Sequence, residues 1–166
     1  MVTTLARSLD DVWAILDEVR DPEVPVLSVV ELGIVRGVSL DGRRAAVDIT
    51  PTYSGCPAMH EIERTILGAL GAHGLEAEVR LVFTPAWTTD WMSEGAREKL
   101  RRYGIAPPGP TVDAPLIPLM RRVAPVACPF CGERTTTTRS EFGATACKSL
   151  HFCNACHQPF EHFKAI

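Results

Sequence analysis

The first hundred residues alternate between stretches of helical and of strand-like periodicity. Apolar residues recur every three to four positions after Ser8, a suitable N-cap, and again over about residues 58–72. A third helix is predicted over residues 94–103, because Ser93 can cap its start and Gly104 its end. The apolar stripes consist of Leu9, Val12, Trp13, Leu16 and Val19 in the first helix and of Met59, Ile62, Ile66 and Ala69 in the second.

The strand-like stretches flank a turn signal at Asp41-Gly42. Residues 29–40 and 43–50 are rich in β-favouring side chains, which predicts a hairpin across this pair. Residues 77–83 alternate apolar and polar side chains and form the third predicted strand. The predicted order is α-β-β-α-β-α. Because a hairpin precedes a helical crossover, we expect a mixed sheet and an α+β fold, built as a small layered α/β domain.

Prolines separate this domain from a cysteine-rich tail. Proline lacks the N–H that helices and central strands need, and the segment has no clear periodicity, which indicates an extended linker. We therefore expect one domain at residues 1–104, a linker at 105–125 and a small module at 126–166. The prolines are Pro107, Pro108, Pro110, Pro115, Pro118 and Pro125.

Two C-x-x-C motifs dominate the tail, Cys128-Pro-Phe-Cys131 and Cys153-Asn-Ala-Cys156. Each motif lets two thiolates converge on one ion from a tight turn, and four sulfurs suit a tetrahedral structural zinc site. With β-favouring residues between them, the motifs predict a zinc ribbon that holds one zinc per chain. A module of about 40 residues seldom folds without a metal or disulfides. Two redox-active dithiols and a rubredoxin-like iron site are the alternatives.

A fifth cysteine of the tail, Cys147, precedes Lys148, whose charge could favour a thiolate. Its position equally suits a small buried residue inside the ribbon. His157 directly follows a predicted ligand, but four cysteines already complete the zinc coordination. We therefore expect the histidines of the tail to be ordinary surface groups or groups around the ligands.

The lone cysteine of the first domain lies in Ser54-Gly55-Cys56-Pro57, between a predicted strand and the second helix. Gly55 permits a tight turn and Pro57 suits the first helical position, so Cys56 should lie near the positive end of the helix dipole. This position favours a thiolate that could act as a nucleophile, a redox thiol or a metal ligand, and a carrier thiol should be open to solvent. A small packed residue is the alternative. A hydrolase would need an oriented base, and nothing fixes His60 in that role.

Two further segments carry unusual residues. Asp21, Glu23 and Glu31 could support metal binding, although acids beside prolines more often cap turns. Trp87 and Trp91 follow the third strand in a loop rich in threonine and proline. They could be core residues or a partner-docking surface, and we expect both to be exposed and to mark a partner surface.

Composition excludes several classes of protein. The chain is 46% hydrophobic and 22% charged, which is typical of a globular protein. A net charge of −3 argues against a strongly basic nucleic-acid binder. No apolar run approaches the ~18 residues of a membrane span, and the acidic N-terminal segment does not resemble a signal peptide. We therefore expect a cytoplasmic protein, with no membrane or nucleic-acid partner, whose cysteines are metal ligands or thiols rather than disulfides.

Several of these motifs together resemble a known family. They are Asp21-Pro22-Glu23-x-Pro25, Glu31-Leu32-Gly33, Ser54-Gly55-Cys56-Pro57 and Pro85-x-Trp87. Over about residues 8–104 the chain is similar to the SufT-like family of iron–sulfur assembly factors. The tail extends the resemblance over nearly the whole chain, to the PaaD family (PaaJ in older naming) of accessory proteins in phenylacetate degradation. The tail motifs are Cys-Pro-x-Cys-Gly, Ser140-Glu-Phe-Gly-x-Thr-x-Cys147-Lys148 and Cys-x-x-Cys-x-x-Pro-Phe160-x-x-Phe163-Lys164.

The resemblance implies a role beside the multicomponent phenylacetyl-CoA epoxidase. The oxygenase of that system has a di-iron site, and its reductase carries a [2Fe–2S] cluster and flavin. The implied role is non-catalytic maturation, namely insertion or repair of the reductase cluster, with the di-iron centre as the alternative target and with Cys56 as transient ligand or transfer thiol. Because clusters normally take about four thiolates, further ligands must come from a second protomer, a client or Cys147.

The implied partners are the oxygenase and reductase components and the iron–sulfur assembly machinery, and a homodimer is compatible with this role. Two other classes stay open. One is a structural adaptor that docks to the oxygenase through the ribbon and the tryptophan loop. The other, less favoured, is a thiol enzyme that uses Cys56.

Overall fold

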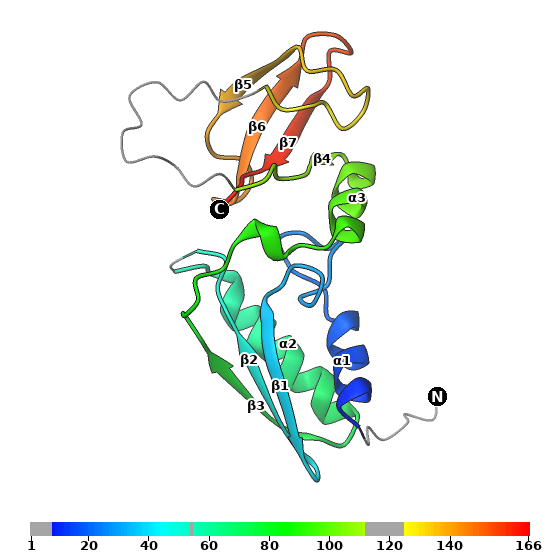
Figure 1. Cartoon of the computed structure of the whole chain (residues 1–166), viewed down its shortest axis with the longest axis vertical. Coiled ribbons are helices and arrows are strands. Elements are labelled where there is room, and N and C mark those ends of the chain that lie inside the picture. Colours follow the sequence, from blue (N-terminus) through cyan, green and yellow to red (C-terminus); the bar gives the residue numbers. More distant parts are fainter. Residues whose placement is uncertain (1–7, 54, 112–124) are drawn as a thin grey trace. The chain divides into compact units, whose positions relative to one another are not determined.

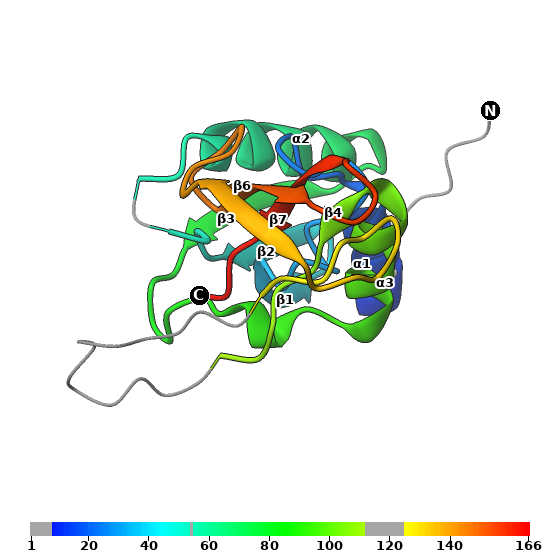
Figure 2. The same cartoon turned by 90° about the horizontal axis from the view of Figure 1, so that it is seen from above.

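The computed structural model describes residues 8–53, 55–111 and 125–166. Its helices and strands follow one another as drawn in Figures 1 and 2. The chain divides into two compact units, Met1–Trp87 with Trp91–Ser93 and Thr88–Asp90 with Glu94–Ile166. Within the described ranges, no helix is long and apolar enough to cross a membrane.

The first unit packs two helices against one face of a three-stranded sheet. Strand β2 pairs antiparallel with β1 and parallel with β3, so the sheet is mixed, as predicted. Every second residue of β2 is buried, namely Ala45, Val47 and Ile49, and these residues form the face that the helices cover. The elements are α1 (Leu9–Glu18), β1 (Val35–Asp41), β2 (Arg44–Ile49), α2 (Ala58–Ala72) and β3 (Glu76–Leu81).

Helix α1 begins where the sequence predicts it. The hydroxyl of Ser8 accepts a hydrogen bond from the N–H of Asp11, and the Asp11 carboxylate accepts one from the N–H of Ser8. This reciprocal capping box satisfies donors that the first turn of a helix would otherwise leave unpaired.

Strand β1 is shorter than predicted. Residues 29–33 form turns, and the strand begins only at Val35. Gly33 has a φ of +72°, and an ideal Cβ built on it would lie 3.0 Å from the Cβ of Trp91. The chain therefore turns sharply at a position that only glycine fits well, which delays the strand.

The second unit is a four-stranded sheet with one helix. Its order is β4-β7-β6-β5, with β4 parallel to β7 and the other pairs antiparallel. The short helix η1 (Thr89–Trp91) spans the junction between the units. The remaining elements are α3 (Glu94–Tyr103), β4 (Ile105–Ala106), β5 (Thr136–Ser140), β6 (Lys148–Cys153) and β7 (Pro159–Phe163).

This grouping differs from the expected division at residues 1–104, 105–125 and 126–166. Helix α3 groups with the ribbon, and Ile105–Ala106 form strand β4 at the place where the linker was expected to begin. Gly104, with a φ of +91°, ends α3 and turns the chain directly into β4. Both residues of β4 are buried, and Ala106 contributes to the core beside the cysteines. The part of the expected linker at residues 112–124 lies outside the described residues.

Candidate functional site

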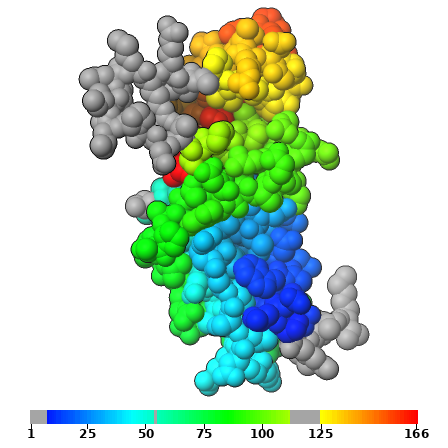
Figure 3. All heavy atoms as spheres, in the orientation of Figure 1, coloured from blue at the N-terminus to red at the C-terminus, as the bar shows by residue number. Residues whose placement is uncertain are grey.

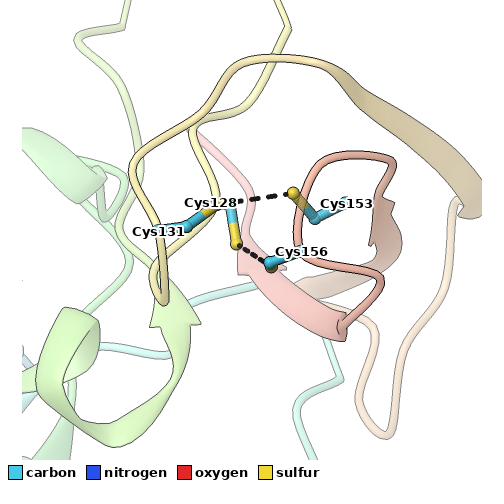
Figure 4. Close-up of side chains that lie close together, drawn as sticks. All are labelled: Cys128, Cys131, Cys153 and Cys156. Carbon is cyan, nitrogen blue, oxygen red and sulfur yellow. Dashed lines mark hydrogen bonds between the residues drawn. The ribbon is translucent and has the colours of Figure 1, made fainter.

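The four cysteines of the two C-x-x-C motifs meet in the second unit (Figure 4). Their Sγ atoms all lie within 4.8 Å of one another. The sulfurs of Cys128 and Cys156 are 3.7 Å apart, and those of Cys131 and Cys153 are 3.6 Å apart. Four thiolates at about 2.3 Å from a zinc ion form a tetrahedron with edges of about 3.8 Å. The spacing therefore fits a four-thiolate zinc ion, and the predicted four-cysteine metal site is confirmed.

The two cysteine turns have the same backbone conformation. In each, the residue four positions after the first cysteine donates its N–H to that cysteine's carbonyl. Gly132 donates to Cys128 at 2.9 Å, and His157 donates to Cys153 at 3.0 Å. Both donors have positive φ, +79° and +59°. Because a side chain in this conformation costs roughly 1 kcal/mol or more, His157 is held there by the turn. This role of His157 was not predicted, although the equivalent position of Gly132 indicates it.

The backbone of the second turn favours a thiolate at Cys153, whereas burial raises the pKa of the Cys156 thiol to about 12. The N–H of Cys156 lowers the pKa of the Cys153 thiol to about 7, and the N–H of Ala155 acts in the same direction. Burial of the thiol opposes this shift. Backbone donors that stabilise a thiolate favour metal ligation, since the thiolate is the ligand. Two of the cysteines, Cys128 and Cys153, are also core residues that pack with Ala106 and Phe160. A bound ion would therefore lie at the edge of the small core of this unit.

Lys148, which follows Cys147 in the chain, forms a buried ion pair with a carboxylate. The Lys148 ammonium lies 2.9 Å from a Glu161 carboxylate oxygen, and its side chain is only 5% exposed. The other Glu161 oxygen accepts the N–H of Ala144 at 2.9 Å. Although burial acts against it, these two donors lower the pKa of Glu161. The Lys148 charge is therefore paired with Glu161, and an effect of Lys148 on the Cys147 thiol stays a prediction.

Cys147 itself is buried in the ribbon. It is 3% exposed, and its sulfur lies 3.0 Å from the hydroxyl of Thr145. Its carbonyl accepts the N–H of Lys164. These contacts agree with a small packed residue. Among the described residues, the only group of three or more metal-ligating side chains is the four-cysteine site, so Cys147 belongs to no second one.

Cys56 lies at the predicted place, immediately before α2. Gly55 has a φ of +78°, Pro57 occupies the N-cap position, and the helix begins at Ala58. The N–H of Cys56 donates to the carbonyl of Tyr53 at 3.2 Å. The expectation of a solvent-open thiol is wrong, because Cys56 is only 9% exposed. Ser54 lies outside the described residues.

The acidic residues serve turns. Asp21 is 6% exposed, and one of its carboxylate oxygens accepts the N–H groups of Glu23 and Val24 at 2.8 and 2.7 Å. Glu31 and Ser28 form a reciprocal pair, in which the carboxylate accepts the Ser28 N–H and the hydroxyl accepts the Glu31 N–H, each at 3.0 Å. Asp21 and Glu31 thus have the capping and turn roles that are more common for acids beside prolines, and Glu23 donates its N–H to the Asp21 turn. Within the described residues the three acids form no metal-ligating group.

The two tryptophans differ from the expected docking surface. Trp87 is 5% exposed, and its indole N–H donates to the carbonyl of Leu32 at 2.9 Å. It is a core residue, and its assignment to a partner surface is wrong. Trp91 is half-buried, with the Arg36 guanidinium 3.5 Å from the centre of its ring. Trp91 therefore already stacks on a cation within the first unit.

Comparisons with known proteins agree with this architecture. Residues 9–82 match the family model described as iron–sulfur cluster assembly protein, and residues 113–164 match that of the PaaD zinc beta ribbon domain. The fold and the cysteine site therefore define a class of protein in which an iron–sulfur assembly domain is joined to a zinc ribbon. Over 168 residues the chain is 44% identical to a subunit of the "Putative 1,2-phenylacetyl-CoA epoxidase" of Escherichia coli (strain K12), with 100% of this chain and 98% of that protein covered. The chain belongs to the family of this epoxidase subunit, the PaaD family.

Relatives of the first unit include maturation factors. The "Fe-S protein maturation auxiliary factor SufT" of Staphylococcus aureus is 36% identical over 83 residues, which cover 48% of this chain and 92% of that protein. Among solved structures, the DUF59 domain of Bacillus anthracis is 29% identical and superposes with a TM-score of 0.47, covering 55% of this chain and 89% of that one.

Proposed function

We propose that this protein is an accessory maturation factor for the multicomponent phenylacetyl-CoA epoxidase, and that it inserts or repairs the iron–sulfur cluster of the reductase component. One observation carries the proposal: a single chain joins an iron–sulfur assembly domain, residues 9–82, to the zinc ribbon of the PaaD family. The first domain supplies a general activity, and the ribbon directs it to one oxygenase system. On this proposal the protein is not itself an enzyme.

The two thiol sites have different roles in this proposal. Cys128, Cys131, Cys153 and Cys156 hold one structural zinc ion per chain, which closes the core of the ribbon. The iron–sulfur cluster is cargo. Cys56 supplies one thiolate to it, and transfer is a ligand exchange in which the bond from Cys56 to iron breaks as a client cysteine binds. Because Cys56 is 9% exposed, the loop before α2 must open for this exchange.

A second candidate function is a structural adaptor of the oxygenase. Two exposed aromatic side chains of the ribbon favour it, Phe130 at 56% and Phe142 at 66% exposed. Large exposed aromatic residues are typical of docking surfaces. An adaptor would need the ribbon but not the Cys56 thiol, so the two functions can be separated by experiment.

The experiment is co-expression of the reductase with the wild-type protein, with no partner, or with the Cys56→Ser variant. Iron and labile sulfide are measured per flavin in the purified reductase. We expect the Cys56→Ser variant to lower both values toward the level found without the partner. The matched control is Cys147→Ser, which alters a buried thiol that the proposal does not use and should leave the values unchanged. Equal cluster content with Cys56→Ser, in a system that still requires the protein, would favour the adaptor.

A further inference from the structure

Strand β3 leaves one edge of the first sheet open. It pairs with β2 on one side, and no strand in the described part of the chain pairs with its other side. The segment that contains β3 lies at the margin of the first unit in Figures 1 and 3, coloured green. The opposite edge of the sheet, β1, is interrupted by an irregularity between Val35 and Gly37, a device that discourages further pairing. The pairing of β3 has no such shift over its six residues.

The open edge presents free backbone groups at alternate residues. The N–H groups of Glu76 and Val82 donate to the carbonyls of Arg43 and Ile49, respectively, on the side of β2. Because a parallel ladder uses every second residue of a strand, Glu78 and Arg80 face β2 in the same way. The N–H and C=O groups of the residues between them, 77, 79 and 81, therefore point outward.

The outward residues continue the apolar core. Ala77, Val79 and Leu81 lie in register with the buried Ala45, Val47 and Ile49 of β2, so their side chains share the face that the helices cover. Coverage ends toward the strand terminus. Leu81 is 50% exposed, and Phe83, two residues further, is 65% exposed. The apolar row is thus incompletely covered at this edge.

The charges on the other face identify the partner. In β3, Glu76, Glu78 and Arg80 share that face with Arg44 and Asp48, as the Arg44–Glu76 and Arg80–Asp48 ion pairs show. If two β3 strands pair antiparallel around Val79, Glu78 of each copy faces Arg80 of the other. A shift of the centre by one residue would bring Glu78 against Glu78 or Arg80 against Arg80. The strand is therefore self-complementary in one register.

We propose that the protein forms a symmetric dimer in which β3 pairs antiparallel with β3 of a second copy, centred on Val79. Val79 then bonds to Val79 of the second copy, and Ala77 bonds to Leu81 on either side, for about six new backbone hydrogen bonds. The two sheets join into one, and the exposed Leu81 packs over the junction. This interaction surface is separate from the four-cysteine site and from Cys56, and it does not depend on the proposed function.

The test measures molar mass by light scattering and sedimentation over a range of concentrations. We expect the full-length protein to reach about 36 kDa, twice the 18.1 kDa of the chain. The variant Arg80→Glu places Glu78 of each copy opposite a second glutamate in the other copy, which makes two like-charged pairs across the two-fold axis of the dimer. We expect it to raise the dimer dissociation constant about tenfold or more. The double variant Glu78→Arg/Arg80→Glu exchanges the charges and should restore the dimer. The matched control, Arg44→Glu, reverses a charge on the same face away from the edge and should have little effect.

A backbone variant provides an independent test. Val79→Pro removes an outward N–H that the ladder with β2 does not use, so it should dissociate the dimer while the chain stays folded. Thermal unfolding of each variant checks the fold. A wild-type protein that stays monomeric at the highest concentration overturns the proposal. So does a dimer that persists in both Arg80→Glu and Val79→Pro, or one that the charge exchange fails to restore while the variant remains folded.

Discussion

Removal of zinc should unfold the ribbon while leaving the first unit folded. The perturbation is a strong chelator or the variant Cys153→Ser. Cys153 is fully buried, lies 3.6 Å from the sulfur of Cys131, and packs against Ala106 and Phe160. Its replacement removes a ligand and also leaves a polar hydroxyl in the small core of the ribbon.

The free energy lost with the zinc ion is expected to exceed the free energy of unfolding of the ribbon. Structural zinc contributes about 10–16 kcal/mol of apparent binding free energy in small zinc domains near neutral pH. A whole domain is typically stable by only about 5–15 kcal/mol. The core beside the cysteines contains Ala106 and Phe160, with Val126 partly buried at its border, and is too small to compensate. Without the ion, the strands that carry the cysteine turns should therefore lose their fixed structure.

Helix α3 should be affected together with the ribbon. An ideal Cβ on Gly104, at the end of α3, would lie 3.1 Å from the ring of Phe130 in the first cysteine turn. The next two residues pair with β7. The boundary of unfolding is therefore expected before residue 94, not after residue 104. The position of this boundary distinguishes the domain division seen in the structure from the division at residue 104 that the sequence predicted.

The assay combines metal analysis with limited proteolysis. We expect about one zinc per chain, and after chelation new cleavage sites between residues 94 and 166. Residues 9–87 should stay protected, and the fluorescence of the half-buried Trp13 and the buried Trp87 should remain unchanged. A ribbon that resists protease without metal would refute the reasoning. An iron chromophore in place of zinc would instead support the rubredoxin-like alternative.

Three further predictions concern individual side chains. Burial, together with the charges of His151 and Lys164, lowers the pKa of His162 from 6.5 to about 4, so the unfolded state binds the proton more tightly between these values. Stability should be full above pH 6.5 and fall by up to about 2 kcal/mol at pH 5, a loss that denaturant titration should find reduced in His162→Gln. Trp87→Phe leaves the Leu32 carbonyl without its donor and should destabilise the first unit by about 1–3 kcal/mol in chemical unfolding. Lys148→Met leaves Glu161 without its cation and should lower the melting temperature of the ribbon more than Lys164→Met, which removes a half-buried ammonium that donates to the Glu141 carbonyl.

Local patterns predicted the features that depend on residues close together in the chain. The N-cap at Ser8, the turn at Gly42 and the hydrophobic stripe of α2 are decided within a few residues, and the structure follows them. The cysteine site was predictable for a related reason. Each C-x-x-C motif forms its own turn from residues close together in the chain. Only the pairing of the two turns is long-range, and it can be inferred because a tetrahedral metal site needs four ligands.

Predictions failed where a distant residue decides the outcome. Trp87 is buried because its indole reaches the carbonyl of Leu32, 55 positions earlier in the chain. The ion pair of Lys148 with Glu161, which lies on a neighbouring strand, was not predicted at all. Strand β4 consists of two residues, too few for any periodicity, and exists because β7 offers an edge. None of these pairings leaves a signal in local sequence.

The two thiol sites differ in a way that bears on the proposed function. The four-cysteine site is completed within its own unit, and its backbone turns hold the sulfurs at the spacing of one metal ion. Such a closed site favours retention of its metal over exchange. Cys56 offers a single sulfur that is 9% exposed, and no other described side chains form a ligand group with it. Since one thiolate cannot hold a cluster, cargo can bind there only while another molecule supplies further ligands. A factor built this way would hold a cluster only while a second copy, its donor or its client supplies those ligands, which suits a transient transfer step better than storage.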